Sequence, residues 1–185
     1  MNIILLRHGK PDVSLKGLLN AVEIKQLVAA YQLSTIQDAP PKYLYEQFNN
    51  YYVVCSDLPR SLKSANKIGF SQADYKDGLF SEADLPHFDQ SKLRLPVTVW
   101  VIVLRVMWIF GFKKNGESFK QAKSRAQRAA IKLIALAEEH ENIILVGHGL
   151  MNRLIAKQLS RLNWRGPVSP GKKYWQFGRY KKEQS

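Results

Sequence analysis

Three short apolar runs along this chain each end abruptly in polar residues. The runs are rich in aliphatic and β-branched side chains, and they cover residues 2–6, 51–55 and 142–146. A continuous apolar run of this length, bounded by polar or turn-forming residues, is typical of a strand that is buried on both faces of a sheet. The sequence also predicts a short strand within residues 73–91 and a last strand over 174–180.

Apolar residues between these runs recur at helical spacing. This spacing predicts helices over residues 15–31, 59–68, 117–139 and 150–159. Strands that alternate with helices build a mostly parallel central sheet with helices on both of its faces. We therefore expect an α/β fold, a three-layer α/β/α sandwich, with residues 1–185 in a single domain.

The residues that follow three of the predicted strands are unusual for a loop. Arg7 and His8 follow the first strand, Ser56 and Arg60 follow the second, and His148 comes after the strand over 142–146. The carboxyl ends of parallel strands meet at one edge of a sheet, where ligands of such folds bind. Two arginines and two histidines would repel one another there unless an anion lay between them. A phosphoryl group fits, because guanidinium groups match its oxygens.

Three segments contain these residues, and a fourth lies between the last two of them, so that the order is Arg7-His8-Gly9, Ser56-Asp57-Leu58-Pro59-Arg60, Gly116-Glu117-Ser118 and Gly147-His148-Gly149. Together they resemble the signature motifs of the histidine phosphatase (phosphoglycerate mutase-like) superfamily, and they occur in the order that this family shows. The resemblance extends over most of the chain. It implies the phosphoglycerate mutase-like form of the α/β/α sandwich.

The resemblance also implies a phosphatase that needs no metal or other cofactor. His8 would attack phosphorus and carry the phosphoryl group as phosphohistidine. Arg7, Arg60 and His148 would bind the phosphoryl oxygens and offset their charge, so that His148 counts both as a catalytic and as a phosphate-binding residue. A carboxylic acid would protonate the leaving oxygen and then activate water.

Two carboxylates compete for the role of this acid. The family places the acid, usually a glutamate, after the third strand, where this chain has Glu82 and Asp84. We select Glu82 and keep Asp84 as the alternative.

Two other functions stay open at this point. One is a phosphoglycerate mutase-like phosphoryl transferase, and the other is a non-catalytic protein that binds a phosphorylated ligand or a membrane surface on the same fold. The motifs do not fix the substrate, which could be a small phosphorylated molecule or a phosphoprotein.

The chain carries a formal net charge of +13, which favours anionic partners. Its lysines and arginines are spread along the sequence and form no recognisable nucleic-acid-binding module, so we expect no nucleic-acid partner. No basic leader precedes the first apolar run, and the one cysteine, Cys55, lies in a predicted strand. These features favour a cytoplasmic protein, with association to a membrane surface as an addition.

Residues 95–112 are almost wholly apolar, with Arg105 as the one charged residue among them. The stretch is too short for a transmembrane helix, and it lies between motifs that must meet in one site. In the family the corresponding insertion, here about residues 92–114, lies over the active site as a lid.

Three interpretations of this stretch stay open. It could be an apolar helix that packs on the domain, or a contact between two copies in a homodimer. It could also be a face that dips into an anionic membrane beside Trp100 and Trp108, with basic flanks at Lys92, Arg94, Lys113 and Lys114.

Overall fold

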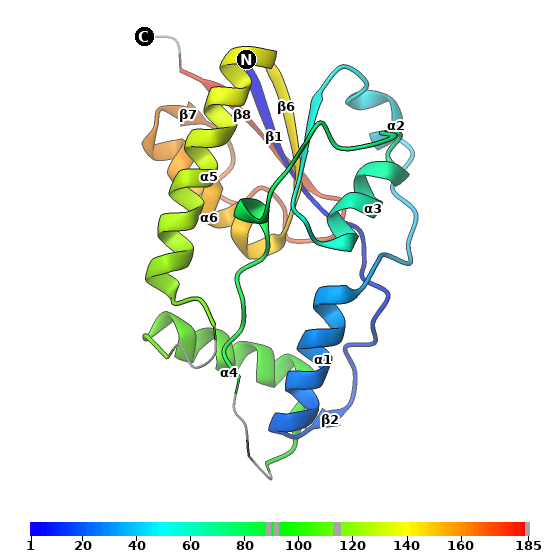
Figure 1. Cartoon of the computed structure of the whole chain (residues 1–185), viewed down its shortest axis with the longest axis vertical. Helices are drawn as coiled ribbons and strands as arrows, with labels where there is room; N and C mark the ends of the chain where they lie inside the picture. The colour runs from blue at the N-terminus through cyan, green and yellow to red at the C-terminus, as the bar shows by residue number, and fades with distance from the viewer. Residues whose placement is uncertain (88–89, 91–92, 113–115, 184–185) are drawn as a thin grey trace.

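A six-stranded sheet forms the centre of the protein in the computed structural model, which describes residues 1–87, 90, 93–112 and 116–183. Its strand order is β4-β3-β6-β1-β8-β7 (Figure 1). The strands are β1 (Asn2–Arg7), β3 (Tyr52–Cys55), β4 (Tyr75–Lys76), β6 (Asn142–Gly147), β7 (Trp164–Arg165) and β8 (Phe177–Lys182). Strands β4, β3, β6 and β1 pair in parallel, whereas β8 is antiparallel to both β1 and β7. The prediction of a mostly parallel central sheet is confirmed.

Helices cover both faces of this sheet. Alternate residues of a strand point to opposite faces, so Ile3 and Leu5 of β1 pack against α5 (Phe119–His140) and α6 (Gly149–Arg161). Ile4 and Leu6 pack on the other side, in the core formed with α2 (Leu44–Gln47) and α3 (Pro59–Lys67). All four β1 side chains are fully buried. This arrangement is the predicted α/β/α sandwich.

A smaller unit lies beyond the carboxyl ends of the parallel strands, at the bottom of Figure 1. It consists of α1 (Ala21–Leu33), α4 (Val97–Ile109) and a two-stranded sheet of β2 (Leu18–Leu19) and β5 (Leu95–Pro96). Its own apolar core joins the two helices through Ala21, Ile24, Val97, Trp100 and Leu104. The unit thus covers the sheet edge at which Arg7, His8 and His148 emerge.

Two predicted boundaries were wrong. The helix expected from residue 15 begins at Ala21, because Gly17 has a positive φ of 107° and Asn20 forms a capping box with Glu23. The last strand, expected over 174–180, is Phe177–Lys182. Trp175 has a φ of 63°, in the left-handed region, so an extended strand cannot run through it.

The remaining elements lie close to their expected places. Helices α3, α5 and α6 begin and end within two residues of the predicted bounds. The strand expected within 73–91 is only the two-residue β4, followed by a 3₁₀ turn, η1 (Gly78–Phe80). The sequence analysis missed β2, β5, β7 and α2.

The apolar stretch 95–112 forms β5 and α4. The interpretation as a helix packed on the domain is confirmed for one side of α4, since Trp100, Leu104 and Trp108 are buried. Within the described ranges, no helix is long and apolar enough to cross a membrane. Of the four expected basic flanks, Arg94 forms an ion pair with Glu23, and the other three lie outside the described residues: Lys92, Lys113 and Lys114.

Candidate active site

His8 and His148 meet because the strands that precede them run side by side. Strands β1 and β6 are parallel, with Arg7 opposite Gly147, so each histidine directly follows an aligned pair. The His8 N–H donates to the Gly147 carbonyl at 3.0 Å, and the two ring centroids lie 5.0 Å apart. Both side chains are buried. The predicted convergence of these two residues is therefore present.

Close packing explains the glycines that flank the two histidines. A Cβ atom at position 9 would lie 2.3 Å from the Trp175 ring, and one at position 149 would lie 3.2 Å from Cζ of Arg7. The first distance is an outright clash. Glycine at these positions therefore lets Trp175 and the Arg7 guanidinium pack directly against the backbone beside each histidine.

The hydrogen bond of the His8 ring fixes its tautomer. Nδ1 lies 2.6 Å from the Gly9 carbonyl oxygen, which can only accept, so Nδ1 donates and Nε2 keeps a free lone pair. The pKa of His8 is well below its ordinary value, mainly because of burial and further because of the charges of His148, Arg60 and Arg7. Both observations favour the neutral imidazole of His8, with its free lone pair on Nε2.

The ring of His148 is oriented by the loop after β3. Its Nε2 lies 2.7 Å from Oγ of Ser56, which itself accepts from the Leu58 N–H at 3.3 Å. The hydroxyl proton of Ser56 is available to Nε2, and in that tautomer the ring proton of His148 is on Nδ1. Burial, and then the charges of three arginines, lower the pKa of His148: Arg60, Arg7 and Arg125.

Arg60 lies in the first turn of α3 and is fully buried. Its Nη1 donates to the carbonyls of Tyr31 at 2.8 Å and Gln32 at 3.3 Å, near the end of α1, and its guanidinium lies 4.6 Å from the centre of the Tyr31 ring. Burial lowers the pKa of Arg60, but an arginine starts from so high a value that it stays charged. The α1 helix thus holds a cation at the carboxyl edge of the sheet.

Arg7 is held by the segment before β8. Its Nη1 donates to the Lys172 carbonyl, and Cζ lies 4.4 Å from the centre of the Tyr174 ring. The same ring lies 5.7 Å from the ring of His8. Tyr174, which the sequence analysis placed in the last strand, instead contacts both residues of the Arg7-His8 pair.

Three buried nitrogens around His8 have no hydrogen-bond partner within the described part of the chain: Nε of Arg7, Nε of Arg60 and Nδ1 of His148. Unpaired buried donors are rare and costly. An anion with several oxygens, such as a phosphoryl group, is the kind of ligand that would pair with all three.

Glu82 and Asp84 lie in different surroundings. The Glu82 carboxylate accepts from the N–H groups of Leu150 at 3.2 Å and Met151 at 3.0 Å, in the first turn of α6 directly after His148. Asp84 is exposed and accepts from the Gln32 side chain at 3.1 Å. Of the two candidates, Glu82 is therefore the one placed beside the histidines.

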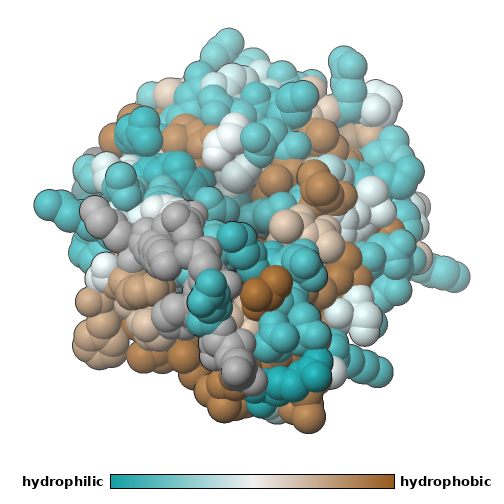
Figure 2. All heavy atoms as spheres, turned by 60° about the horizontal axis from the view of Figure 1, so that its bottom comes forward, coloured by the Kyte–Doolittle hydropathy of each residue, from teal (hydrophilic) through white to brown (hydrophobic). Residues whose placement is uncertain are grey.

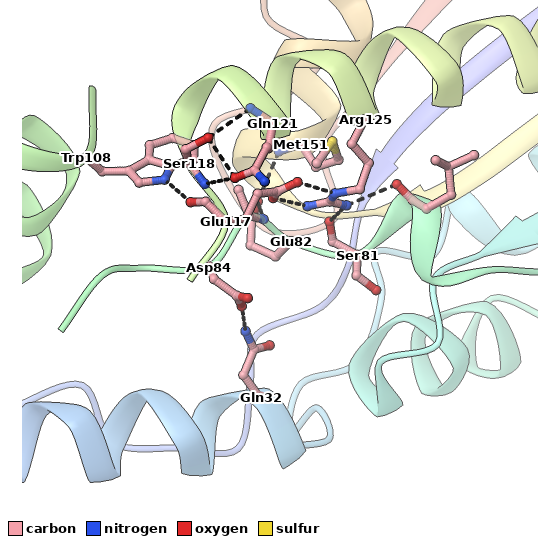
Figure 3. A network of polar contacts seen from close by, with 12 residues as sticks. Gln32, Ser81, Glu82, Asp84, Trp108, Glu117, Ser118, Gln121, Arg125 and Met151 are labelled. Carbon is pink, nitrogen blue, oxygen red and sulfur yellow. Dashed lines mark hydrogen bonds and ion pairs between the residues drawn. The ribbon is translucent and has the colours of Figure 1, made fainter. Parts of the chain in front are cut away.

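A polar network behind Glu82 fixes the loop that carries it (Figure 3). Arg125 of α5 forms a two-pronged ion pair with Glu117, at 2.8 and 2.7 Å, and donates to the carbonyls of Leu79 at 3.0 Å and Ser81 at 2.7 Å. Glu117 belongs to the Gly116-Glu117-Ser118 motif, but the sequence analysis missed Arg125. The available signal was its position beside Ala122, Ala126 and Ala129, which line the buried face of α5.

A cavity of about 240 Å³ extends from Arg7, Arg60 and Glu82 to the space between α1 and α4. Tyr174 and Arg105 also line it. His8 is only 1% exposed, and Tyr174, whose ring lies beside that of His8, lines the cavity. Sequence reasoning missed Tyr174, whereas Arg105 was visible as the one charge in an apolar stretch.

Among the described residues, no group of three or more His, Cys, Asp or Glu side chains is arranged to hold a metal ion.

The family model of the histidine phosphatase superfamily (branch 1) matches residues 3–168. A search among curated proteins found no match. Among solved structures, a mycobacterial glucosyl-3-phosphoglycerate phosphatase is similar to this chain, with 20% identity and a TM-score of 0.59. The match covers 96% of this chain and 88% of the other.

Two further structures show the same fold. The product of a Mycobacterium tuberculosis open reading frame is 22% identical with a TM-score of 0.55, and the match covers 96% and 89% of the two chains. A putative alpha-ribazole-5'-P phosphatase from Escherichia coli is 18% identical with a TM-score of 0.52, covering 88% of this chain and 79% of the other.

Proposed function

The chain belongs to the histidine phosphatase superfamily, and we propose that it is a phosphatase that hydrolyses phosphomonoesters through a phosphohistidine on His8. One observation carries this proposal. Beside the ring of His8 lie three buried nitrogens that have no acceptor in the part of the chain that the structure describes, and they belong to Arg7, Arg60 and His148. A nucleophile among unpaired donors, two of which are guanidinium groups, suits attack on an anionic phosphoryl group.

In the first step, the lone pair of His8 Nε2 forms a bond to phosphorus while the bond from phosphorus to the ester oxygen breaks. Arg7, Arg60 and the Nδ1–H of His148 hold the remaining phosphoryl oxygens, whose charge is spread in the transition state. Protonated Glu82 donates its proton to the leaving oxygen, which departs as a neutral alcohol.

In the second step, the Glu82 carboxylate takes a proton from water as the water oxygen attacks phosphorus. The bond between phosphorus and Nε2 breaks, its electron pair returns to His8, and inorganic phosphate leaves. Both steps use side chains only, so the proposal includes independence from metals.

The proposed location is the cytoplasm. It is supported by Cys55, which is free and buried in β3, where burial raises the pKa of its thiol to about 12. A thiol of this kind is inert and needs no oxidising compartment.

The test is hydrolysis of p-nitrophenyl phosphate in EDTA, from acidic to neutral pH. Wild type and His140→Ala should be active, because His140 stacks on Tyr52 outside the site, whereas His8→Ala should be inactive. A wild type that binds phosphate without hydrolysing the ester would favour the non-catalytic alternative. A phosphoenzyme that persists until a second phosphorylated substrate is added would favour the phosphoryl transferase.

A further inference from the structure

The lining of the cavity between α1 and α4 changes character along its length. One part is charged and is lined by Arg7, Arg60, Glu82 and Arg105, and the charge of Glu82 acts on both Arg60 and Arg105. The rest is aliphatic and is formed mainly by Ile24, Leu27, Val28, Leu85, Val97 and Val101. The cavity therefore has an anion-binding part next to an apolar part.

One face of α4 extends along both the charged and the apolar part of the cavity. Val97, Val101 and Arg105 are spaced four residues apart, so they lie on the same face of the helix, and all three line the cavity. The three positions extend over about 12 Å of helix axis. A molecule bound along this face would meet Arg105 at one end and valine side chains at the other.

Arg105 adds a third guanidinium to the anion-binding part. Its Nη2 donates to the Ala83 carbonyl at 3.2 Å, and Cζ lies 5.2 Å from the centre of the Trp108 ring. Its Nη1 is buried and has no hydrogen-bond partner within the described ranges. Like Nε of Arg7 and Nε of Arg60, this nitrogen is a buried donor that a bound anion could pair with.

We infer that the substrate is the phosphate monoester of an apolar alcohol. Its phosphoryl group would lie among Arg7, Arg60 and Arg105, and its aliphatic or aromatic body would lie against the apolar walls of α1 and α4. This inference rests on the proposed function of the site. A sugar phosphate fits poorly, because its hydroxyl groups would be buried against valine, leucine and isoleucine without partners.

The other polar side chains of the cavity do not change this conclusion. Tyr31 and Gln32 contact Arg60, Gln32 also donates to Asp84, and Tyr174 lies on Arg7. These side chains are engaged at the charged part of the cavity, and the side chains that line the rest of it are aliphatic.

Binding of alkylphosphonates, which cannot be hydrolysed, tests the inference directly. Calorimetry with methyl-, butyl- and hexylphosphonate should show affinity that rises by about fourfold for each added methylene until the cavity is full. In parallel, kcat/KM should be higher for hexyl phosphate than for glucose 6-phosphate.

Two variants of α4 test whether the gain in affinity with chain length arises in this cavity. Val101→Phe fills the apolar part, so it should abolish the gain from methyl- to hexylphosphonate and leave methylphosphonate affinity within about twofold. Ile102→Phe adds the same ring to the outer side of the helix, where Ile102 is 62% exposed, and should keep the gain.

The outcomes separate this inference from the proposed function. Hydrolysis of p-nitrophenyl phosphate without any dependence on chain length would overturn the inference alone. Chain-length-dependent binding without hydrolysis of any ester would overturn the proposed function and leave the ligand class standing. An equal loss of the chain-length gain in both α4 variants would place the binding site elsewhere.

A second, independent observation concerns the outer side of α4. Ile102, Val106, Ile109 and Phe110 all point to solvent, and Phe110 is 86% exposed. Figure 2, turned so that this end comes forward, shows hydrophobic side chains gathered along the lower rim of the face. An exposed apolar patch of this kind marks a binding surface.

We propose that this outer side of α4 inserts into the interface of an anionic membrane. The net charge of +13 favours an anionic bilayer over a second copy of the chain as the partner of this surface, because the bilayer attracts the chain whereas two copies repel each other. Helix α4 is apolar on its outer side as well as on the side packed against the domain, so the outer side can lie at the boundary between headgroups and acyl chains.

Vesicle sedimentation tests this surface. The protein should sediment with vesicles enriched in phosphatidylserine and much less with phosphatidylcholine alone. Ile102→Asp should weaken binding by about tenfold or more, whereas Ile131→Asp, at an exposed position of α5, should not. Absence of binding to anionic vesicles, or a dimer in light scattering that Ile102→Asp dissociates, would overturn the membrane proposal.

Discussion

Nε2 of His148 lies 2.7 Å from Oγ of Ser56, so the loop after β3 orients a ring that follows β6. The hydroxyl accepts from the Leu58 N–H and has its own proton to donate to Nε2. This arrangement keeps the ring proton of neutral His148 on Nδ1, where it can be donated to a phosphoryl oxygen.

Ser56→Ala should therefore lower kcat by about tenfold, the effect of one lost hydrogen bond that orients the His148 ring. The matched control is Ser61→Ala, which is equally buried and whose hydroxyl contacts the Val146 carbonyl and the Ser56 N–H. Steady-state kinetics of both variants measure the loss of kcat, and their Tm values show whether either variant is destabilised. If both lose the same fraction of kcat, Ser56 acts only through packing.

The lowered pKa values of His8 and His148 make stability depend on pH. An unfolded histidine takes up a proton near pH 6.5, but these two rings do so only at lower pH in the folded state. Below about pH 6.5 the unfolded state thus binds more protons, and stability falls as the pH drops, whereas above that pH it is fully present.

Urea unfolding at pH 7.5 and 5.5 measures this effect. The free energy of unfolding of wild type should fall by about 1 kcal/mol more than that of His148→Gln over this interval. The same pH dependence in both proteins would mean that His148 is protonated equally easily in the folded and unfolded chain.

The choice of Glu82 over Asp84 as the acid is tested with two leaving groups. Glu82→Gln should lower kcat/KM, which reports the step that releases the leaving group, by about a hundredfold or more for an alkyl phosphate, because the departing alkoxide needs a proton. The loss should be far smaller for p-nitrophenyl phosphate, whose leaving group is stable as an anion. Asp84→Asn should leave both rates nearly unchanged, and the reverse pattern would assign the role to Asp84.

Arg125 should act by positioning rather than by touching the substrate. Arg125→Lys keeps the charge but loses the fork that holds Glu117 and the loop before Glu82. We expect kcat to fall by about tenfold with methylphosphonate affinity unchanged. Arg128→Lys, at an exposed position of the same helix, is the control. A weakened phosphonate affinity with unchanged kcat would contradict a role confined to Glu82.

The sequence predicted those parts of the fold that depend on local patterns. Strands β1, β3 and β6 are continuous apolar runs, and candidate site residues follow directly after them. Parallel pairing of β1 with β6 is therefore enough to bring His8 and His148 together. The β2–β5 pair was missed because two-residue strands far apart in sequence carry no periodic signal.

The missing parts of the site depend on tertiary contacts. Tyr174 covers Arg7 and His8 only because Trp175 adopts a left-handed conformation and donates its N–H to the Arg7 carbonyl. Nothing in the spacing of the nearby apolar residues indicates that turn. Arg105 was visible as an isolated charge in an apolar stretch, but only the packing of α4 shows that it lines the same cavity as Glu82.

The central claim is that the phosphoryl group passes through His8. Mass spectrometry of peptides from protein quenched at alkaline pH during turnover of p-nitrophenyl phosphate, in EDTA, tests it most directly. We predict a phosphorylated peptide that contains His8, formed and lost at rates that account for turnover, and absent from His8→Ala. Steady hydrolysis by His8→Ala, or turnover by wild type with no phosphorylated His8 at any time, would contradict the account.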